Sequence, residues 1–460
     1  METVLRLSQD HHSQLHTHLF PGDGQEAVAF ALCGRRPGKQ RYVLTGQMIF
    51  PIPYDQCLVR TPMRVTWSTD TLIPLLTEAS KRGLALVKIH SHPSGFAEFS
   101  STDDASDRDL FPSVYGWMND ESPHASAVML PDGRIFGRVV RPEGEFEQIS
   151  LVSVIGDDLS FWRAIDNKTG LPEFALRHAQ AFGIGTTEKL RSLSAAVIGC
   201  SGTGSPVIEQ LARLGIGKLT LVDPDFVEAK NLNRIQNSTM EDVIRKSPKV
   251  DVMARAIVAM GLGTQISVFA KNLFDPQVVK AVAECDVVFG CMDTVDGRHL
   301  LNKLATFYVL PYFDVGVKLV SDGIGGIDQV CGTVHYIQPG RSSLFSRRVY
   351  TLEQLRAAGL KRTDPTAYEE LRREKYISGV QEDRPAVISV NAIFASLAVN
   401  EFLARLHPYR DDANSHFATY RFSLSQAQLY TECEGEPCKM LLRHVGRGDV
   451  RPLLDMPELS

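Results

Sequence analysis

Residues 195–225, "AAVIGCSGTGSPVIEQLARLGIGKLTLVDPD", decide the fold of the larger part of the chain. A short apolar run leads into a glycine-rich turn, a helical stretch and a second apolar run that ends in Asp223. This order is typical of a β-α-β unit in a parallel sheet.

The turn contains Gly199, Gly202 and Gly204, which give the pattern G-x-x-G-x-G. It departs from the dinucleotide fingerprint G-x-G-x-x-G in its middle glycine. A helix that begins directly after such a turn presents backbone N–H groups to a phosphate. Asp223 follows at the end of the next strand, where a carboxylate can bind a ribose hydroxyl. The stretch therefore predicts a nucleotide site.

The same alternation continues along the chain. Short apolar runs at 195–199, 218–223, 265–270 and 286–290 alternate with helical segments. We therefore predict a doubly wound, Rossmann-like α/β domain over residues 191–460 that includes a carboxyl-terminal extension. The apolar run 386–399 contains Asn and Ser and is too short to span a bilayer, so it predicts a core helix. Residues 351–385 are highly charged and predict an exposed excursion.

The amino-terminal third has a different pattern. Residues 41–50 and 84–90 have strand composition, 70–83 have helical spacing and end in Gly83, and 126–140 form a hairpin around a Pro-Asp-Gly turn. We predict a small α+β domain over residues 1–155, followed by a helical linker over 156–190.

Composition narrows the classes of function. With 43% hydrophobic residues, 22% charged residues and a net charge of −5, the chain is ordinary for a globular protein and argues against nucleic-acid or membrane binding. The polar amino terminus is not typical of a secretory signal, and the eight cysteines lack a regular spacing. We expect a cytoplasmic protein with reduced thiols.

The stretch "HSHPSGFAEFSSTDD" (90–104) contains a metal-ligand pattern. His90 and His92 follow a predicted strand and share one face, and Asp103 can return as a third ligand. Ser100 could donate a hydrogen bond to a developing oxyanion. Asp104 is the alternative ligand, because it is adjacent to Asp103. A His-x-His pair alone is commonly a surface feature, so the argument depends on the full spacing.

That spacing resembles the JAMM (MPN-plus) zinc isopeptidases. The resemblance implies a zinc ion held by His90, His92 and Asp103, and a general base on another strand. Glu26, in "GQEAVAFALCG", is acidic within an apolar strand and fits that role, with a solvated strand residue as the alternative.

Downstream of the glycine-rich turn, "DFVEAKNLNRI", "SPKVDVMARAI" and "CMDTVDGRHLLN" resemble ThiF/MoeB-type adenylating enzymes over about 175–405. The resemblance implies that Asp223 binds the ribose and that Asp293, beside Thr294, positions magnesium. It implies that the triphosphate is bound by Asn231, Asn233, Arg234 and Lys249. It also makes Arg177, in "FALRHAQAFG", a candidate arginine finger across a homodimer.

The two resemblances together imply that both domains act on the same kind of substrate. ATP-dependent adenylation would activate the carboxyl terminus of a ubiquitin-like protein, and the zinc peptidase would process or deconjugate the same modifier. Sulfur transfer for cofactor biosynthesis, or adenylation of a peptide, are the alternatives. A scaffold with degenerate domains is disfavoured, because both sets of chemical residues are intact.

The cysteines predict how the acyl group leaves. Related enzymes often carry a catalytic cysteine and a structural zinc held by two Cys-x-x-Cys pairs. Where the first pair is expected, this chain has Ser342 and Ser343, and Cys433 and Cys438 are wrongly spaced for the second. We predict no structural zinc in this domain and direct transfer to a partner such as a conjugating enzyme. Cys331 is expected to be buried, and an oxyester on either serine is a more speculative route.

Overall fold

The computed structural model describes residues 1–164, 170–322, 324, 326–373 and 386–460. Two compact units divide the chain. The first contains residues 1–167, 306–309 and 444–455, and the second contains 168–305, 310–443 and 456–460. Residues 444–455 thus belong to the first unit although they are far in sequence from residues 1–167, which form most of it. No helix among the described residues is long and apolar enough to cross a membrane.

A nine-stranded mixed sheet forms the centre of the first unit, in the order β11-β10-β1-β3-β2-β6-β7-β8-β9. Its strands are β1 (Glu2–Ser8), β2 (Val28–Pro37), β3 (Arg41–Pro51), β6 (Ala85–Ser91), β7 (His124–Met129), β8 (Ile135–Val140), β9 (Phe146–Gln148), β10 (Leu151–Ile155) and β11 (Leu159–Arg163). A separate hairpin pairs β4 (Cys57–Thr61) with β5 (Arg64–Trp67).

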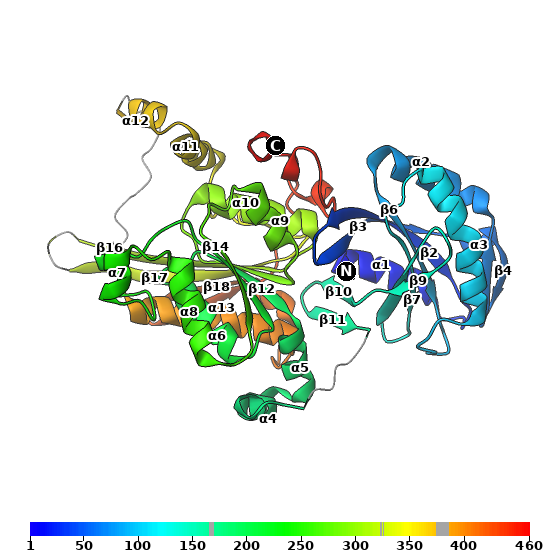
Figure 1. The fold of residues 1–460 in the computed structure, drawn as a ribbon, viewed down its shortest axis with the longest axis horizontal. Helices are drawn as coiled ribbons and strands as arrows, with labels where there is room; N and C mark the ends of the chain where they lie inside the picture. The colour runs from blue at the N-terminus through cyan, green and yellow to red at the C-terminus, as the bar shows by residue number, and fades with distance from the viewer. Residues whose placement is uncertain (165–169, 323, 325, 374–385) are drawn as a thin grey trace. The chain divides into compact units, whose positions relative to one another are not determined.

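Helices cover both faces of this sheet: α1 (Gln9–Leu19) on one, and α2 (Ile73–Arg82) with α3 (Ser101–Met118) on the other. Successive residues of β2 belong to opposite cores. Ala29 and Ala31 pack with the α1 side, and Phe30 and Leu32 with the α2–α3 side, as a pleated strand requires. Figure 1 shows α2 and α3 side by side.

Local signals placed these elements correctly. Residue Gly83 adopts a left-handed conformation and ends α2, and β7 and β8 form the predicted hairpin. The helical linker expected over 156–190 is wrong at its start. Residues 159–163 form strand β11, which pairs with β10, and helix begins only at α4 (Leu176–Phe182) and α5 (Ile184–Ser192). Alternate residues Leu159 and Phe161 are buried, as on one face of a strand, while the backbone of β11 pairs with the edge strand β10.

An eight-stranded sheet forms the centre of the second unit, in the order β14-β13-β12-β15-β16-β17-β18-β19. Its first five strands are parallel, which confirms the doubly wound α/β prediction. Its strands are β12 (Ser194–Ile198), β13 (Lys218–Val222), β14 (Gln265–Phe269), β15 (Val287–Gly290), β16 (Tyr312–Ser321), β17 (Ile327–Ile337), β18 (Thr419–Ser423) and β19 (Gln428–Glu432).

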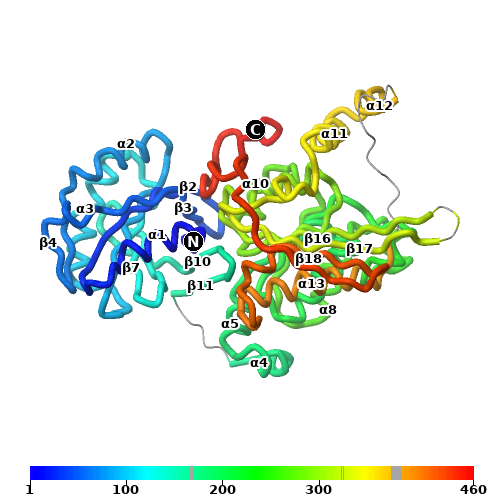
Figure 2. Tube along the Cα trace, turned by 180° about the vertical axis from the view of Figure 1, so that it is seen from behind, coloured from blue at the N-terminus to red at the C-terminus, as the bar shows by residue number. Residues whose placement is uncertain are grey.

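The remaining helices of this unit are α6 (Gly204–Arg213), α7 (Met240–Arg245), α8 (Lys249–Met260), α9 (Pro276–Ala283), α10 (Val295–Tyr308), α11 (Leu352–Thr363), α12 (Pro365–Arg373) and α13 (Ile388–Leu406). Figures 1 and 2 place α10 and α13 on opposite sides of the sheet. Helix α13 confirms the predicted core helix. The charged excursion 351–385 contains α11 and α12, and its residues 374–385 lie outside the described part.

Candidate functional sites

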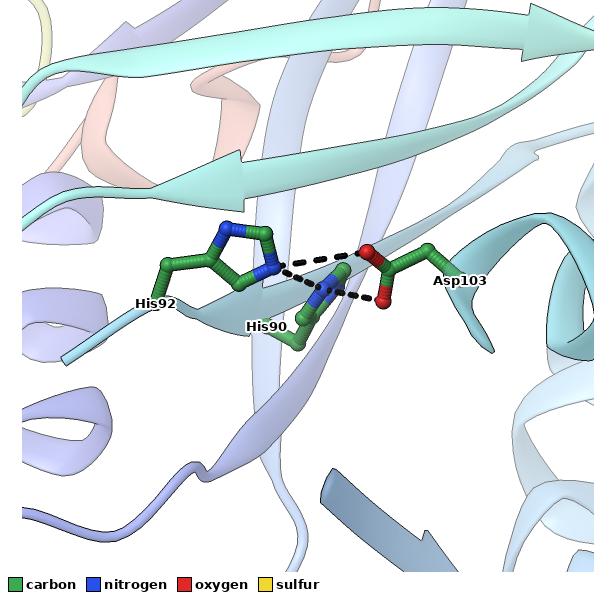
Figure 3. A group of neighbouring side chains, drawn as sticks. All are labelled: His90, His92 and Asp103. Atoms are coloured by element: carbon green, nitrogen blue, oxygen red, sulfur yellow. Dashed lines mark hydrogen bonds and ion pairs between the residues drawn. The ribbon is translucent and has the colours of Figure 1, made fainter. Parts of the chain in front are cut away.

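Strand β6 and helix α3 bring together the histidines and the aspartate of the metal pattern (Figure 3). His90 is in β6, His92 follows it directly, and Asp103 is in the first turn of α3. All three side chains are buried. Each offers one possible metal-ligand atom, and these atoms all lie within 4.8 Å of one another. Alternation along the strand gives both imidazoles the same face.

The distances among these atoms fit a tetrahedral metal. The two Nε2 atoms of His90 and His92 are 3.2 Å apart, and Asp103 oxygens lie 2.9 Å and 3.4 Å from them. Ligands at zinc–ligand distances near 2.05 Å in a tetrahedron are separated by about 3.3 Å. The separation of the two imidazole nitrogens is therefore close to that of two zinc ligands, and one oxygen of Asp103 lies near each nitrogen.

Hydrogen bonding fixes which imidazole nitrogen is available. Nδ1 of His92 donates to the carbonyl oxygen of Phe96 at 2.7 Å, so the neutral ring presents the lone pair of Nε2 to a metal. Burial lowers the pKa of His90, which favours its neutral, ligating form. Burial alone would lower the pKa of His92 too, but its hydrogen bonds to Asp103 and Phe96, together with the charges of Asp103 and Glu26, outweigh burial and raise the pKa.

The helix start explains why Asp103 faces the histidines. Ser100 is the N-cap of α3: its Oγ accepts from the Asp103 N–H, and Asp103 Oδ2 accepts from the Ser100 N–H and Oγ at 2.7 Å. The hydroxyl proton of Ser100 is thus directed at a ligand carboxylate, and a role toward an oxyanion stays a prediction. The alternative ligand, Asp104, pairs instead with Arg138 and Arg108.

Glu26 lies immediately before β2 rather than inside it. In the antiparallel pairing of β2 with β6, Val28 is opposite His90. Two residues earlier, Glu26 falls opposite His92 and shares its face.

The side chain of Glu26 is buried, with 7% exposed. Burial raises its pKa to about 7; His92 and Lys88 oppose the shift, and the Asp103 carboxylate adds to it. The buried carboxyl group of Glu26 thus lies beside the His/His/Asp group, and its role as general base stays a prediction.

The second cluster surrounds the glycine-rich turn between β12 and α6. Gly199 has φ +94°, and a Cβ there would lie 2.7 Å from the Cys291 carbonyl oxygen. A Cβ on Gly204 would lie 1.7 Å from the Gly199 oxygen. Only glycine permits this tight turn. At Gly202 a Cβ would meet the amide of Asn391 at 2.2 Å.

Asn391, in α13, was missed because an amide inside an apolar helix carries no local signal for what it will face. The sequence showed only that a polar residue interrupts the run. The structure places this amide against the glycine-rich turn and buries it, with 3% exposed.

Asp223 follows β13 and is buried beside the turn. It accepts hydrogen bonds from the Cys200 N–H at 2.7 Å and the Asp225 N–H at 2.9 Å. Burial raises its pKa, while Lys249, whose Nζ is 3.9 Å away, opposes the shift. Lys249 also forms an ion pair of 2.7 Å with Asp225. The predicted ribose and phosphate residues therefore adjoin.

The Asn-Leu-Asn-Arg segment forms a short turn near the same loop. Asn231 is buried and accepts from the Glu228 N–H at 3.1 Å, while Asn233 donates to the Ala386 carbonyl at 3.4 Å. The guanidinium of Arg234 donates to the Lys230 carbonyl at 2.8 Å and to Asn233 at 3.1 Å.

Asp293 and Thr294 follow β15, which pairs with β12. Strand order reverses between these two strands, because β13 and β14 lie on one side of β12 and β15 lies on the other. Ligands of doubly wound sheets bind in the crevice at such a reversal. The glycine-rich turn and Asp293 both lie at the carboxyl ends of the two strands that border it.

A buried acidic residue that was not predicted, Asp314, lies on β16 in register with Gly290 of β15. Arg298, in α10, binds both oxygens of buried Asp314 at 3.0 Å and 2.8 Å, and the hydroxyl of Tyr312 donates to the same carboxylate. Arg177 is on α4 with an exposed side chain, and its role across a dimer stays a prediction.

The segments where related enzymes carry cysteine pairs adjoin in this chain. The Cys438 N–H donates to the Arg341 carbonyl at 3.0 Å. Ser342 donates to Glu434, and Arg347 binds Ser342 at 2.8 Å and pairs with Glu434 at 3.2 Å. The ion pair between Arg347 and Glu434 thus joins the two segments. The hydroxyl of Ser342 is buried and hydrogen-bonded to both side chains.

All eight cysteines are free thiols in the structure. Cys433 is exposed and Cys438 is buried. The prediction that Cys331 is buried is wrong: it is half-buried, because β17 extends beyond the helices that cover its other end.

Comparison with known proteins supplies the family. Residues 175–438 match the ThiF family and residues 8–135 match prokaryotic homologs of the JAB domain. The adenylyltransferase and sulfurtransferase MOCS3 of Danio rerio is 34% identical over 113 residues, 25% of this chain and 24% of that protein. Ubiquitin-like modifier-activating enzyme 5 of Caenorhabditis elegans is 29% identical over 170 residues, 35% of this chain and 38% of that protein.

Among solved structures, E. coli MccB with MccA-N7isoASN has a TM-score of 0.46 at 18% identity, covering 59% of this chain and 75% of that one. The two curated relatives named above are matched over 24% and 38% of their own length, so the chain spans less than half of each. The ThiF match covers more than half of the chain and contains every residue of the predicted nucleotide site. The chain belongs to the ThiF family and carries a JAB-like domain before its ThiF domain.

Proposed function

We propose that this chain adenylates the carboxyl terminus of a ubiquitin-like protein and that its JAB-like domain is a zinc peptidase for the same modifier. The observation that carries the proposal is the presence, in one chain, of a nucleotide crevice and a convergent His/His/Asp cluster. One site forms an acyl bond at a carboxyl terminus and the other hydrolyses an amide at that kind of terminus.

In the adenylating reaction, a carboxylate oxygen of the modifier attacks the α-phosphorus of ATP, and pyrophosphate leaves with the electrons of the broken P–O bond. The product is an acyl-adenylate. Arg234 and Lys249 hold the charge that develops on the phosphates, and Asp223 binds the ribose. Asp293, with Thr294 beside it, would hold magnesium.

In the peptidase reaction, His90, His92 and Asp103 would hold zinc. A bound zinc ion polarises the scissile carbonyl and lowers the pKa of water. Glu26 accepts a proton from the attacking water and returns it to the leaving amine. The buried position of Glu26 opposite His92 keeps that proton transfer within the site.

Adenylation for sulfur transfer is the second candidate. It is favoured by the similarity to MOCS3, whose name includes sulfurtransferase activity. In that case sulfide-level sulfur from a sulfur donor would attack the acyl carbon and displace AMP, which would leave a thiocarboxylate on a small carrier protein.

Magnesium-dependent ATP–pyrophosphate exchange tests the adenylating activity, measured with small β-grasp proteins that end in Gly-Gly. Exchange should depend on the carrier, disappear in Asp293→Ala and weaken in Arg234→Ala. It should persist in Glu26→Gln, which is the matched control because that residue belongs to the other unit. Full exchange in Asp293→Ala contradicts the assignment.

The peptidase is tested on the same carrier proteins extended beyond their carboxyl terminus. Cleavage should be lost in Glu26→Gln while one zinc per chain is retained.

The product that follows the acyl-adenylate distinguishes the two candidate functions. An isopeptide adduct supports modifier conjugation, and a thiocarboxylate found by mass spectrometry supports sulfur transfer.

A further inference from the structure

A buried charge cluster lies directly beside the His/His/Asp group. It consists of Lys88 in β6, Asp107 in α3 and Arg138 in β8, which are 2%, 0% and 6% exposed. Lys88 pairs with Asp107 and donates to Ser106 at 3.3 Å. Arg138 donates to one oxygen of Asp107 through two nitrogens, at 3.0 Å and 2.6 Å.

This cluster repeats the spacing of the metal ligands. Lys88 and His90 are two residues apart on β6, a step of about 6.6 Å along a strand. Asp103 and Asp107 are four residues apart on α3, a step of about 6 Å along a helix. The pairs Lys88–Asp107 and His90–Asp103 are therefore two parallel rungs between the same strand and the same helix.

Stability alone explains the cluster poorly. Burying charges is costly, and replacing a buried ion pair by apolar groups is often neutral or stabilising. Ion pairs with hydrogen bonds are directional, however, whereas apolar contacts allow a helix to slide along a strand. The rung at Lys88 and Asp107 fixes the position of α3 along its axis relative to β6.

We propose that Asp107 is a positioning residue for the metal ligands. Held by Lys88 and Arg138, it sets the position of α3 so that Asp103 meets His90 and His92 at metal-binding spacing before any metal is bound. This inference rests on the proposed zinc site.

Arg138 adds selectivity between two adjacent carboxylates. Besides Asp107 it pairs with Asp104, whose side chain is thereby held away from the histidines. The same guanidinium thus leaves Asp103 as the carboxylate that faces His90.

The test measures Zn²⁺ affinity of the full-length apo protein by competition with a chromophoric chelator, and the visible absorption of the Co²⁺-loaded protein. Asp107→Asn has nearly the same shape and should bind Zn²⁺ about 10- to 100-fold more weakly. Losses of this size are typical when residues that orient metal ligands are mutated. Its cobalt bands should also change. Lys88→Arg, which keeps the charge, should retain affinity. Asp109→Asn is the matched control, an exposed position on the same helix.

The outcomes separate the two proposals. A wild-type chain that binds no Zn²⁺ overturns the peptidase site and the positioning role with it. If the wild-type chain binds Zn²⁺, and Asp107→Asn is less stable but has the same Zn²⁺ affinity and the same cobalt spectrum, only the positioning role is overturned. If Asp107→Asn does not fold, Lys88→Gln, which leaves Arg138 on Asp107, is measured in the same way, and unchanged affinity overturns the proposal.

Discussion

Gly204, the first residue of α6, lies so close to Gly199 that a Cβ on Gly204 would come within 1.7 Å of the Gly199 carbonyl oxygen. The obstacle is backbone, which cannot move aside without opening the turn between β12 and α6. The position of the amino-terminal end of α6 therefore depends on both residues being glycine.

Gly204→Ala should therefore reduce pyrophosphate exchange about 100-fold, because phosphate-binding N–H groups would be displaced. It should also lower the free energy of unfolding by about 1–3 kcal/mol. Gly359→Ala, in α11 with nothing near the added Cβ, is the control and should leave exchange unchanged. Normal exchange in Gly204→Ala would contradict the role of the turn.

His124, fully buried in β7, should make the first unit sensitive to acid. Its Nδ1 accepts from the Leu86 N–H at 2.9 Å, and burial together with nearby Arg35 lowers its pKa to about 3. The unfolded chain has a histidine pKa near 6.5 and binds a proton that the folded chain excludes. Stability contributed by this group is present above pH 6.5 and falls as the pH drops, by about 2 kcal/mol at pH 5.

Tryptophan fluorescence measures this effect in the intact protein, since Trp67, Trp117 and Trp162, the three tryptophans of the chain, all belong to the first unit. Urea unfolding of wild type and His124→Asn at pH 8 and pH 5 should show a smaller loss of stability in the variant. Equal losses in the two proteins would rule out His124 as the group responsible.

The segment 444–455 should be required for the stability of the first unit. The Gly446 carbonyl accepts from the Gly34 N–H at 3.2 Å and from the Thr45 hydroxyl at 2.8 Å, and the Asp449 N–H donates to the Arg35 carbonyl at 2.8 Å. Ending the chain after residue 443 removes these three bonds, at about 1 kcal/mol each.

We expect the tryptophan-detected unfolding free energy to fall by about 3 kcal/mol in the shortened chain. A chain ending after residue 455 is the control and should unfold as wild type does. If the chain ending after residue 443 has wild-type stability, the segment contributes nothing to the unit.

Transfer of the acyl group should leave no thioester on this chain. Cys433 is the exposed thiol among Cys331, Cys433 and Cys438, and the carboxylate of the next residue, Glu434, is already paired with Ser342 and Arg347. Incubation with ATP and the carrier protein, followed by a non-reducing gel, should show no thiol-sensitive adduct. An adduct that disappears in Cys433→Ser would overturn direct transfer.

Arg177 should act in trans if it is an arginine finger. Mixed dimers of Arg177→Ala and Asp293→Ala chains contain one site with both residues present, so mixing the two inactive variants should restore about a quarter of wild-type exchange. Exchange that is normal in Arg177→Ala alone, or absent after subunit mixing, would remove this residue from the mechanism.

Residues close in sequence made the candidate sites predictable. His90 and His92 share a face because strand side chains alternate, and Ser100 with Asp103 forms a capping box because the helix begins there. Similarly, Gly199 and Gly204 act within one turn. In each case the geometry follows from local backbone conformation, which nearby residues determine.

Other relationships could not be read in this way. Asp104 is paired with Arg138, more than thirty residues later in the chain, and the amide of Asn391 reaches Gly202 from a distant helix. Strand β11 was misread as helix because the open edge of β10 that it pairs with is a property of the assembled sheet.

The sequence by itself therefore determined the two fold classes, the group of ligand-type residues and the glycine-rich turn, since periodicity and glycine conformation act over a few residues. Only the tertiary structure decided that residues 444–455 complete the first unit and that Lys88 and Asp107 form a rung beside the metal ligands. Such pairings are selected by the packing and the burial of charge across the whole unit, because a backbone segment or a charged group finds its partner only when the surrounding strands and helices have excluded water.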